Sequence, residues 1–399
     1  MKTRNELIEL ESVSIFQTYK RLPIIVDKAK GCRIYDMDGK VYLDFLGGIA
    51  VNALGHGHPK IIAAASNQIK KYMHLSNYYY QEAQILLAEK LKKLTGYSRI
   101  FFSNSGTESV EGAIKLVRRW AALNGKKDII SFTGAFHGRT YGALSMMDKP
   151  LYKDKMGPFL TDITILPYND SNKLLEKINN DTAAVFLEFI QGEGGIICAN
   201  KEFVNTIFEL KNQYGFLVVA DEIQSGTGRT GKFFGFDHYG VKPDVVTMGK
   251  GLGGGLPLGA ILAKESLAGV WEKGMHGTTY GGNAVACSTG LVVLEELENG
   301  LLNHVSDIGN YLHEKLENIH SQFPEKIKEV RGIGLMKGLL LSFDATILMN
   351  KLLEKKIITN AASGTVLRFV PPLIIGKDEI DEFSDGLIEV LNEVTIAIS

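Results

Sequence analysis

The stretches Leu217-Val-Val-Ala-Asp-Glu-Ile-Gln-Ser-Gly226 and Val245-Val-Thr-Met-Gly-Lys-Gly-Leu-Gly-Gly-Gly255 decide the fold of this chain. Each is an apolar run that ends in a charged residue, Asp221 in the first and Lys250 in the second. A short run that is rich in Val and bounded by turn formers is typical of a fully buried strand in a parallel sheet. If the two strands are neighbours, both charged side chains project into the crevice beyond the carboxyl ends, where such sheets bind ligands.

Strand-like and helix-like segments alternate along most of the chain, which predicts an α/β fold with a mostly parallel sheet. Strands are expected at 129–133, 183–187, 216–220 and 245–248, and helices at 60–71, 81–94, 107–124, 202–213 and 284–298. From about Leu302 the order changes to a long helix, a Gly-punctuated strand region at 330–342, and helices at 345–355 and 379–393. We predict an N-terminal segment (1–54) that joins the small domain and contains a hairpin at 31–44, a large domain (55–300), and a smaller C-terminal α+β domain (301–399).

Composition restricts the function classes. A chain of 399 residues with 45% hydrophobic residues can bury a large core and has the length of two domains. The formal net charge is -1, so the chain lacks the excess of basic residues that nucleic-acid binders carry. The sequence also has no polybasic cluster of the kind that binds a membrane surface. No apolar run reaches the roughly 20 residues of a membrane span, and the N-terminal residues lack the apolar core of a signal peptide, so we expect a cytoplasmic protein. The widely spaced Cys32, Cys198 and Cys287 predict free buried thiols rather than disulfides or a zinc site.

A lone Lys between glycines, opposite an acidic side chain, suits the chemistry of pyridoxal phosphate. The amine of Lys250 can condense with the cofactor aldehyde, and a carboxylate such as Asp221 can pair with the pyridinium nitrogen and keep the ring an electron sink. Two apparent nucleotide motifs of the form G-x-G-x-x-G, at 226–231 and 249–254, are weak because neither lies between a strand and the start of a helix. A Walker loop is excluded because Gly251, not Ser or Thr, follows the Lys.

The cofactor phosphate needs its own site, and the stretch Phe101-Phe-Ser-Asn-Ser-Gly-Thr-Glu108 predicts one. Ser105 and Glu108 have the spacing of a capping box and apolar residues follow at helical spacing, so Gly106 and Thr107 are expected in the first helical turn. Free backbone N–H groups and the helix dipole there favour a dianion. Taken alone, the stretch also reads as an ordinary helix start. Together with the acid and the lysine, phosphate binding becomes the favoured interpretation.

With these residues in place, the chain resembles the class III, ornithine-type aminotransferases, which use pyridoxal phosphate on fold type I, the fold of aspartate aminotransferase. The resemblance covers nearly the whole chain and implies a large domain with a mostly parallel sheet plus a smaller α+β domain. It rests on motifs that occur in the family's order: Gly55-His-Gly-His-Pro59, Asn104-Ser-Gly-Thr-Glu108, Phe136-His-Gly-Arg-Thr140, Glu188-Phe-Ile-Gln-Gly-Glu-Gly-Gly195, Asp221-Glu-Ile-Gln224, Lys250, His276-Gly-Thr-Thr-Tyr-Gly-Gly-Asn283 and Leu367-Arg-Phe-Val-Pro-Pro372.

The resemblance implies a role for each matching cofactor residue. Lys250 matches the lysine that binds the cofactor and later moves a proton at the substrate carbon, and Asp221 matches the partner of the ring nitrogen. Both are predicted to be catalytic. Phe136 is expected to stack on the ring, Gln224 to reach the ring hydroxyl, and His137 to pack beside the cofactor rather than transfer a proton.

The resemblance also places the phosphate at Ser105, Gly106 and Thr107, with Thr279 of the other subunit completing the site. A ligand supplied by the partner makes the homodimer the smallest competent unit. No metal is expected, because His56-Gly-His58 is not followed by further ligands at useful spacing.

Substrate recognition must handle an amine donor and 2-oxoglutarate in turn. Arg139 and Arg368 match the family's two carboxylate anchors, and guanidinium suits a carboxylate through its paired donors. Glu193 matches the acid beside the second Arg, which can neutralise it while an ω-amine binds and then move away when glutamate brings its own carboxylate. The other substrate contacts that we expect are Tyr19, Glu188 and Thr278.

Within the family, Tyr19-Lys-Arg-Leu-Pro23 and Gly47-Gly-Ile-Ala-Val-Asn52 resemble the acetylornithine branch. In the plain ornithine aminotransferases a Tyr stands where we align Ile49, and an apolar residue there favours an acylated donor. The expected reaction converts N-acetylornithine and 2-oxoglutarate to N-acetylglutamate 5-semialdehyde and glutamate, as in arginine biosynthesis. The alternatives are N-succinylornithine, ornithine or 4-aminobutyrate aminotransferases of the same class, and a nonenzymatic cofactor sensor. Departures from the usual pattern at Thr107, Val110 and Phe189 affect fine geometry, not the chemistry.

Overall fold

A seven-stranded sheet forms the centre of the structure, a computed structural model that describes residues 2–395. The strand order is β4-β12-β11-β10-β7-β5-β6, and only β12 runs antiparallel to its neighbours. The predicted mostly parallel sheet is therefore confirmed. The strands are β4 (Arg99–Ser103), β5 (Asp128–Phe132), β6 (Ile163–Leu166), β7 (Thr182–Leu187), β10 (Leu217–Asp221), β11 (Val245–Met248) and β12 (Gly259–Ala263).

The two apolar runs that predict the sheet are neighbouring parallel strands, β10 and β11, and every residue of both is buried. Asp221 is the last residue of β10 and pairs in register with Thr247 of β11. Lys250 follows β11 by two residues in a left-handed backbone conformation, with φ 44°. The acid and the lysine therefore leave the sheet at the same edge, as neighbouring strands require.

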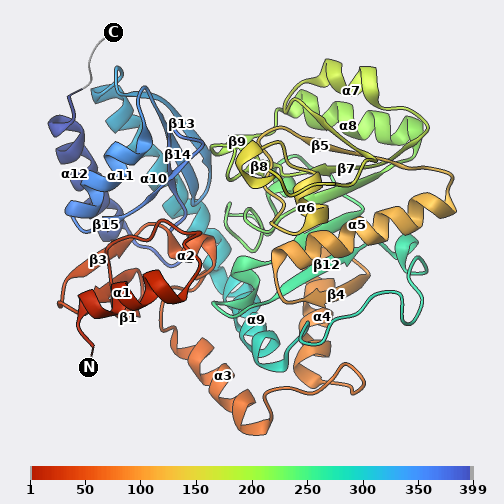
Figure 1. Cartoon of the computed structure of the whole chain (residues 1–399), viewed down its shortest axis with the longest axis horizontal. Helices are drawn as coiled ribbons and strands as arrows, with labels where there is room; N and C mark the ends of the chain where they lie inside the picture. Colours follow the sequence, from red (N-terminus) through yellow and green to blue (C-terminus); the bar gives the residue numbers. More distant parts are fainter. Residues whose placement is uncertain (1, 396–399) are drawn as a thin grey trace.

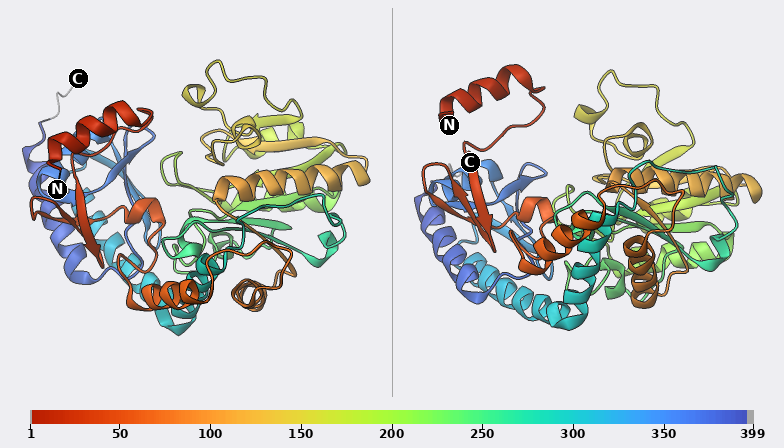
Figure 2. Two further views of the ribbon diagram at one scale, coloured as in Figure 1. Left: turned by 60° about the horizontal axis from the view of Figure 1, so that its bottom comes forward. Right: turned by 90° about the horizontal axis from the view of Figure 1, so that it is seen from below.

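Helices cover both faces of this sheet, and Figure 2 shows α5 (Gly106–Leu123) lying across it. Because side chains alternate along a strand, Val219 and Val245 pack in one apolar cluster with α5, whereas Val218 and Val246 belong to the core on the other face. The remaining helices of this part are α3 (Pro59–Lys71), α4 (Glu82–Thr95), α6 (Tyr141–Ser145), α7 (Ser171–Lys177), α8 (Lys201–Tyr214) and α9 (Ala284–Glu296).

The two ends of the chain meet in the second part of the molecule, where Figure 1 shows the N-terminal strands beside the C-terminal helices. The short β15 pairs in parallel with β3, and β1, β2 and β3 form an antiparallel meander in which β2 and β3 are the predicted hairpin. A second sheet has the order β13-β14-β17-β16. The elements are α1 (Arg4–Ser14), β1 (Val26–Lys30), β2 (Arg33–Asp36), β3 (Val41–Asp44), α2 (Gly47–Ala50), α10 (Leu302–Gln322), β13 (Ile327–Ile333), β14 (Met336–Leu341), α11 (Ala345–Glu354), β15 (Ile357–Ile358), β16 (Asn360–Ala362), β17 (Val366–Phe369) and α12 (Lys377–Glu393).

A continuous helical segment connects the two parts, since α9 passes through a short π-helical turn, η5 (Leu297–Leu301), into α10. The turn bends at Gly300, whose φ is 108°, at the predicted boundary between residues 300 and 301. The division into segments 1–54, 55–300 and 301–399 stays a prediction. Within residues 2–395, no helix combines the length and the apolar character needed to cross a bilayer.

The predicted free cysteines are all unpaired. Cys32 and Cys287 are buried, but the prediction of burial is wrong for Cys198, which is partly exposed. The reason is its position in the two-stranded β8 (Ile190–Gln191) and β9 (Ile197–Cys198) hairpin, which lies outside the three larger sheets.

Candidate active site

A cavity of about 260 Å³ lies at the carboxyl edge of β10 and β11. It brings together most of the residues that the sequence predicted for the site. The lining consists of Gly106, Thr107, Phe136, His137, Gly138, Arg139, Glu188, Glu193, Asp221, Ile223, Gln224 and Lys250. An amine, a carboxylate and a helix start thus share one enclosure, although they come from segments far apart in the chain.

Burial in this cavity, together with the positive charge of Arg368, lowers the pKa of Lys250 to about 8. The carboxylates of Glu193, Asp221 and Glu188 act in the opposite direction and limit the shift. Since the exposed amine of a lysine titrates well above this value, a much larger fraction of Lys250 is uncharged near neutral pH. An uncharged amine is the form that can attack an aldehyde.

Asp221 is held from two sides. Its Oδ2 lies 2.7 Å from Nδ1 of His137, and its Oδ1 accepts a hydrogen bond of 3.1 Å from the backbone N–H of Ile223. Burial alone would lower the pKa of His137, but the hydrogen bond and the charge of Asp221 raise it. Among the described residues, Nε2 of His137 has no hydrogen-bond partner although it is buried. His137 therefore orients the carboxylate, a contact beyond the predicted packing.

Glu188 holds the residue that directly precedes His137 in the chain. Its Oε2 accepts a hydrogen bond of 2.9 Å from the backbone N–H of Phe136. Burial and the charge of Asp221 outweigh the positive charge of His137 and raise the pKa of Glu188 to about 7. In the structure the carboxylate of Glu188 holds the backbone of Phe136, the residue that we expect to stack on the cofactor ring. A contact of Glu188 with the substrate stays a prediction.

Arg368 lies on β17 and is only 1% exposed in its side chain. Its Nη1 lies 2.6 Å from Oε1 of Glu193 and 3.4 Å from Oε1 of Gln224, and its Nε donates to Oδ1 of Asn360 at 2.8 Å. Burial would raise the pKa of Glu193, but the charge and hydrogen bond of Arg368 outweigh it and lower the pKa. The expected Arg–Glu pair is thus formed, and the amide oxygen of Gln224 faces the guanidinium.

The start of α5 forms the predicted phosphate turn, with Gly106 as its first helical residue. The Oγ of Ser105 accepts a hydrogen bond from the backbone N–H of Glu108 at 3.3 Å, but the predicted capping box is wrong in its second half. The Glu108 carboxylate instead accepts from the backbone and side-chain nitrogens of Asn104, at 2.8 and 2.9 Å, because that amide adds a donor which Ser105 lacks. Gly106 and Thr107, whose first-turn N–H groups have no partner within the helix, still line the cavity.

Five predicted residues do not line this cavity. Ser105 directly precedes the lining residue Gly106, and Arg368 contacts the lining residues Glu193 and Gln224. The other three are Tyr19, Thr278 and Thr279. Tyr19 is 73% exposed and lies in the segment between α1 and β1. Thr278 accepts a hydrogen bond of 3.1 Å from Nδ2 of Asn104 outside the cavity, and Thr279 is exposed. The roles of Tyr19 and Thr278, and the supply of Thr279 to the other subunit's site, stay predictions.

The residues of the cavity fit pyridoxal phosphate. Lys250 and Asp221 offer the amine and the carboxylate, and the start of α5 offers N–H groups for the phosphate. Glycines allow close packing around this site: a Cβ at position 249 would lie 3.1 Å from Cα of Gly106, and a Cβ at position 192 would lie 2.3 Å from Oε1 of Gln224.

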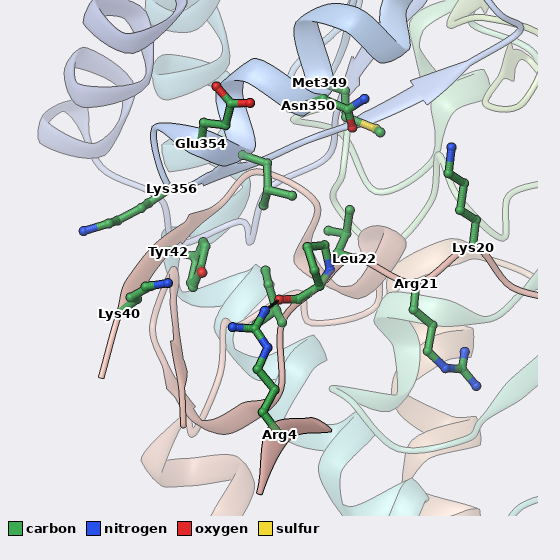
Figure 3. Close-up of a pocket in the computed structure, with 13 residues that line it drawn as sticks. Arg4, Lys20, Arg21, Leu22, Lys40, Tyr42, Met349, Asn350, Glu354 and Lys356 are labelled. Carbon is green, nitrogen blue, oxygen red and sulfur yellow. Dashed lines mark hydrogen bonds between the residues drawn. The ribbon is translucent and has the colours of Figure 1, made fainter. Parts of the chain in front are cut away.

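A larger cavity, of about 500 Å³, lies between the N-terminal segment and α11 (Figure 3). It is lined by Arg4, Lys20, Arg21, Leu22, Pro23, Ile24, Lys40, Tyr42, Met349, Asn350, Leu353, Glu354 and Lys356. In Figure 3 the charged ends of Lys20 and Arg21 point away from it, and Arg4 is committed to Asp38 at 3.0 Å. Because its basic groups do not converge, we place the chemistry in the smaller cavity.

Two contacts of the carboxylate anchors were missed by the sequence reasoning. Asn360 binds Arg368, and the ring of Tyr152 lies under Arg139. Neither residue belongs to a motif that we recognised. Both contacts arise from tertiary packing, which sequence spacing does not reveal.

Similarity to known proteins identifies the family of this chain. The family model described as "Aminotransferase class-III" matches residues 15–391. This chain belongs to the class-III aminotransferases. As a member of this family it is a pyridoxal-phosphate-dependent aminotransferase of fold type I, and the expectations of family, fold, enzyme class and cofactor are confirmed.

Three relatives show how this aminotransferase compares with characterised members. An acetylornithine aminotransferase of Methanocaldococcus jannaschii is 45% identical over 97% of this chain and 98% of its own. The N-acetylornithine aminotransferase structure from Stenotrophomonas maltophilia is 34% identical, with a TM-score of 0.83 over 97% of this chain and 98% of its own. An ornithine aminotransferase structure from Toxoplasma gondii, with PLP at partial occupancy in its active site, is 29% identical, with a TM-score of 0.94 over 99% of this chain and 96% of its own.

Proposed function

We propose that this aminotransferase moves the terminal amino group of N-acetylornithine to 2-oxoglutarate, giving N-acetylglutamate 5-semialdehyde and glutamate for arginine biosynthesis. The observation that carries the proposal is the buried Arg368–Glu193 pair, 2.6 Å apart, beside the amine of Lys250. Arg368 is the carboxylate anchor, and Glu193 is a counter-charge that can move away from it. Such a pair suits an enzyme whose two substrates differ in whether they bring a carboxylate to Arg368. The names of the Methanocaldococcus and Stenotrophomonas relatives support the choice of donor.

Arg139 and Arg368 bind different carboxylates in the two half reactions. Arg139, at the cavity wall, binds the carboxylate that both the donor and 2-oxoglutarate carry far from the reacting carbon. While the ω-amine reacts, Glu193 neutralises Arg368. When 2-oxoglutarate binds, its α-carboxylate replaces Glu193, whose side chain is already 30% exposed and can turn to solvent. Neither half reaction then leaves the guanidinium of Arg368 buried and unpaired.

Two residues do the proton work. When bound, pyridoxal phosphate supplies the aldehyde that takes up the amino group and a ring that stabilises negative charge at the substrate carbon. Asp221 would hold a proton on the ring nitrogen, and His137 keeps the carboxylate of Asp221 oriented through the 2.7 Å contact. Lys250 would take the proton from the substrate carbon that carries the amine and return it to the cofactor carbon on the other side of the nitrogen, a step for which a pKa of about 8 is suited near neutral pH.

Assays of glutamate formation with N-acetylornithine, N-succinylornithine, ornithine and 4-aminobutyrate, each with 2-oxoglutarate, test the proposal. We expect the highest kcat/KM with N-acetylornithine. Ornithine is the second candidate, because solved ornithine aminotransferases match the fold with a TM-score of 0.94. Activity confined to unacylated donors would refute the choice of N-acetylornithine, and absence of turnover with every donor would favour a cofactor sensor.

A homodimer is part of the proposal. Large aromatic side chains are exposed on this chain, among them Phe16 at 90%, Tyr78 at 95% and Tyr80 at 98%, and exposed apolar patches mark interfaces. Mixing two impaired variants, Lys250→Ala and Thr279→Ala, provides the test. If Thr279 serves the partner's phosphate site, each mixed dimer contains one intact site and activity rises on mixing. If activity does not rise on mixing, Thr279 does not contribute to the active site of the partner subunit.

The cytoplasmic location stays a prediction. Fractionation of cells that express the chain, with aminotransferase activity as the readout, would test it.

A further inference from the structure

Arg139 has an unusual environment for a carboxylate anchor. Among residues 2–395 its guanidinium forms no ion pair and no side-chain hydrogen bond. Its contact is aromatic: Cζ of Arg139 lies 3.5 Å from the centroid of the Tyr152 ring and 5.6 Å from that of Phe136. A guanidinium that stacks on a ring keeps its N–H donors in its own plane, free for another partner.

The ring of Tyr152 is itself held in place. Tyr152 closes a short 3-10 turn, η1 (Pro150–Tyr152), in which Lys153 and Asp154 both donate backbone hydrogen bonds to the carbonyl of Pro150, at 2.9 and 3.0 Å. The ring also meets the edge of Phe136, with centroids 6.2 Å apart and planes at 85°. The surface on which Arg139 rests is therefore formed before a substrate arrives.

Lys149 binds the polar end of the same ring. Its Nζ donates to the hydroxyl of Tyr152 at 3.1 Å and lies 4.7 Å from the ring centroid. Two cations thus contact one phenol ring, and only Arg139 lines the cavity. Tyr152 does not line the cavity, so its contribution to the substrate passes through Arg139.

We propose that Tyr152 is a positioning residue, which holds the guanidinium of Arg139 by cation–π stacking so that one edge of the guanidinium presents paired N–H donors to the distal carboxylate of the substrate. The proposal rests on the function proposed above, since it names the support of that anchor. A free Arg side chain loses rotamer entropy when a ligand fixes it, and a stacked guanidinium has lost part of that freedom already. Tyr152 therefore strengthens carboxylate binding without touching the carboxylate.

The test uses Tyr152→Leu with two donors that differ only in the carboxylate. N-acetylputrescine is N-acetylornithine without that group, so it has nothing for Arg139 to bind. We expect Tyr152→Leu to lower kcat/KM for N-acetylornithine about three- to thirty-fold, mainly through KM, and to leave kcat/KM for N-acetylputrescine unchanged within about twofold. The conservative Tyr152→Phe keeps the ring and should recover most of the loss. An equal loss with both donors, or no loss with either, would overturn the proposal.

Two controls separate positioning from simple loop damage. Phe159→Leu removes another ring of the same segment, under Lys153 at 4.7 Å, without touching Arg139, and should leave both donors unaffected. In an Arg139→Met background, Tyr152→Leu should cause no further loss. A further loss there would contradict the mechanism. If the wild-type enzyme proves inactive with N-acetylornithine, the proposed donor is wrong, and the same comparison is made with ornithine and putrescine.

Discussion

Replacing Glu193 with Gln should change which amine the enzyme prefers. The substitution keeps an oxygen next to Nη1 of Arg368 but removes the negative charge that lies 2.6 Å away. In the free enzyme and with an ω-amine donor, Arg368 is then buried without a counter-charge. Glutamate, which brings its own α-carboxylate to Arg368, restores the pair. Glu193→Gln is thus expected to favour glutamate over N-acetylornithine.

The size of the effect follows from the burial of the pair. Breaking a fully buried ion pair costs about 3–5 kcal/mol. Arg368 is 1% exposed but Glu193 is 30% exposed, so water screens part of the charge and about 1–3 kcal/mol is the appropriate range. At about 1.4 kcal/mol for each factor of ten, the ratio of kcat/KM for glutamate to kcat/KM for N-acetylornithine should rise roughly 5- to 150-fold.

Single-turnover kinetics of the pyridoxal form with each amine measures this ratio directly. Glu329→Gln is the matched control, since Glu329 pairs with Arg331 at 2.6 Å but is 53% exposed and lies outside the cavity. Its ratio should stay at the wild-type value. A ratio in Glu193→Gln that is unchanged within about twofold, or that falls, would refute the counter-charge role.

Three further predictions concern the cofactor. Lys250→Ala should abolish transamination with little change in thermal unfolding, because the side chain makes no hydrogen bond that holds the fold among the described residues, and a variant with normal turnover would overturn the assignment. Cofactor uptake by the apoenzyme should accelerate as pH rises towards 8 and level off above it, because the pKa of Lys250 is lowered to about 8 and only the uncharged amine reacts; stopped-flow absorbance that still shows acceleration to pH 10 would contradict this. Gly138→Ala should weaken cofactor binding by about tenfold or more, measured by titration, since its Cβ would lie 2.1 Å from Oγ1 of Thr107 at a φ of 128°; unchanged affinity would show that the loop can adapt.

The sheet and the cofactor end of the site could be predicted from the sequence because each depends on local signals. Buried Val-rich runs predict β10 and β11, and their neighbouring placement follows from α/β winding. A Ser before a helical apolar pattern predicts the start of α5 at Gly106. The chemistry of Lys250 and Asp221 then follows from where parallel strands end.

The contacts that support the anchors could not be predicted in this way. Tyr152 reaches Arg139 through the packing of a loop, and Asn360 reaches Arg368 across the pairing of β16 with β17, where the two residues are in register. The capping box failed for a related reason, because Asn104 and Ser105 compete for one region of the helix start and geometry decides between them. The role proposed for Thr279 involves a second subunit, which the sequence of one chain does not place.

The most direct test of the account is a visible absorption titration of the purified enzyme, loaded with pyridoxal phosphate, first with N-acetylornithine and then with 2-oxoglutarate. The account predicts that the band of the bound cofactor disappears with the donor, returns with 2-oxoglutarate, and yields one glutamate for each cofactor. A band that ignores N-acetylornithine but responds to another amine would contradict the donor, and a band that ignores every amine would contradict the placement of Lys250 and Asp221 around one reactive ring.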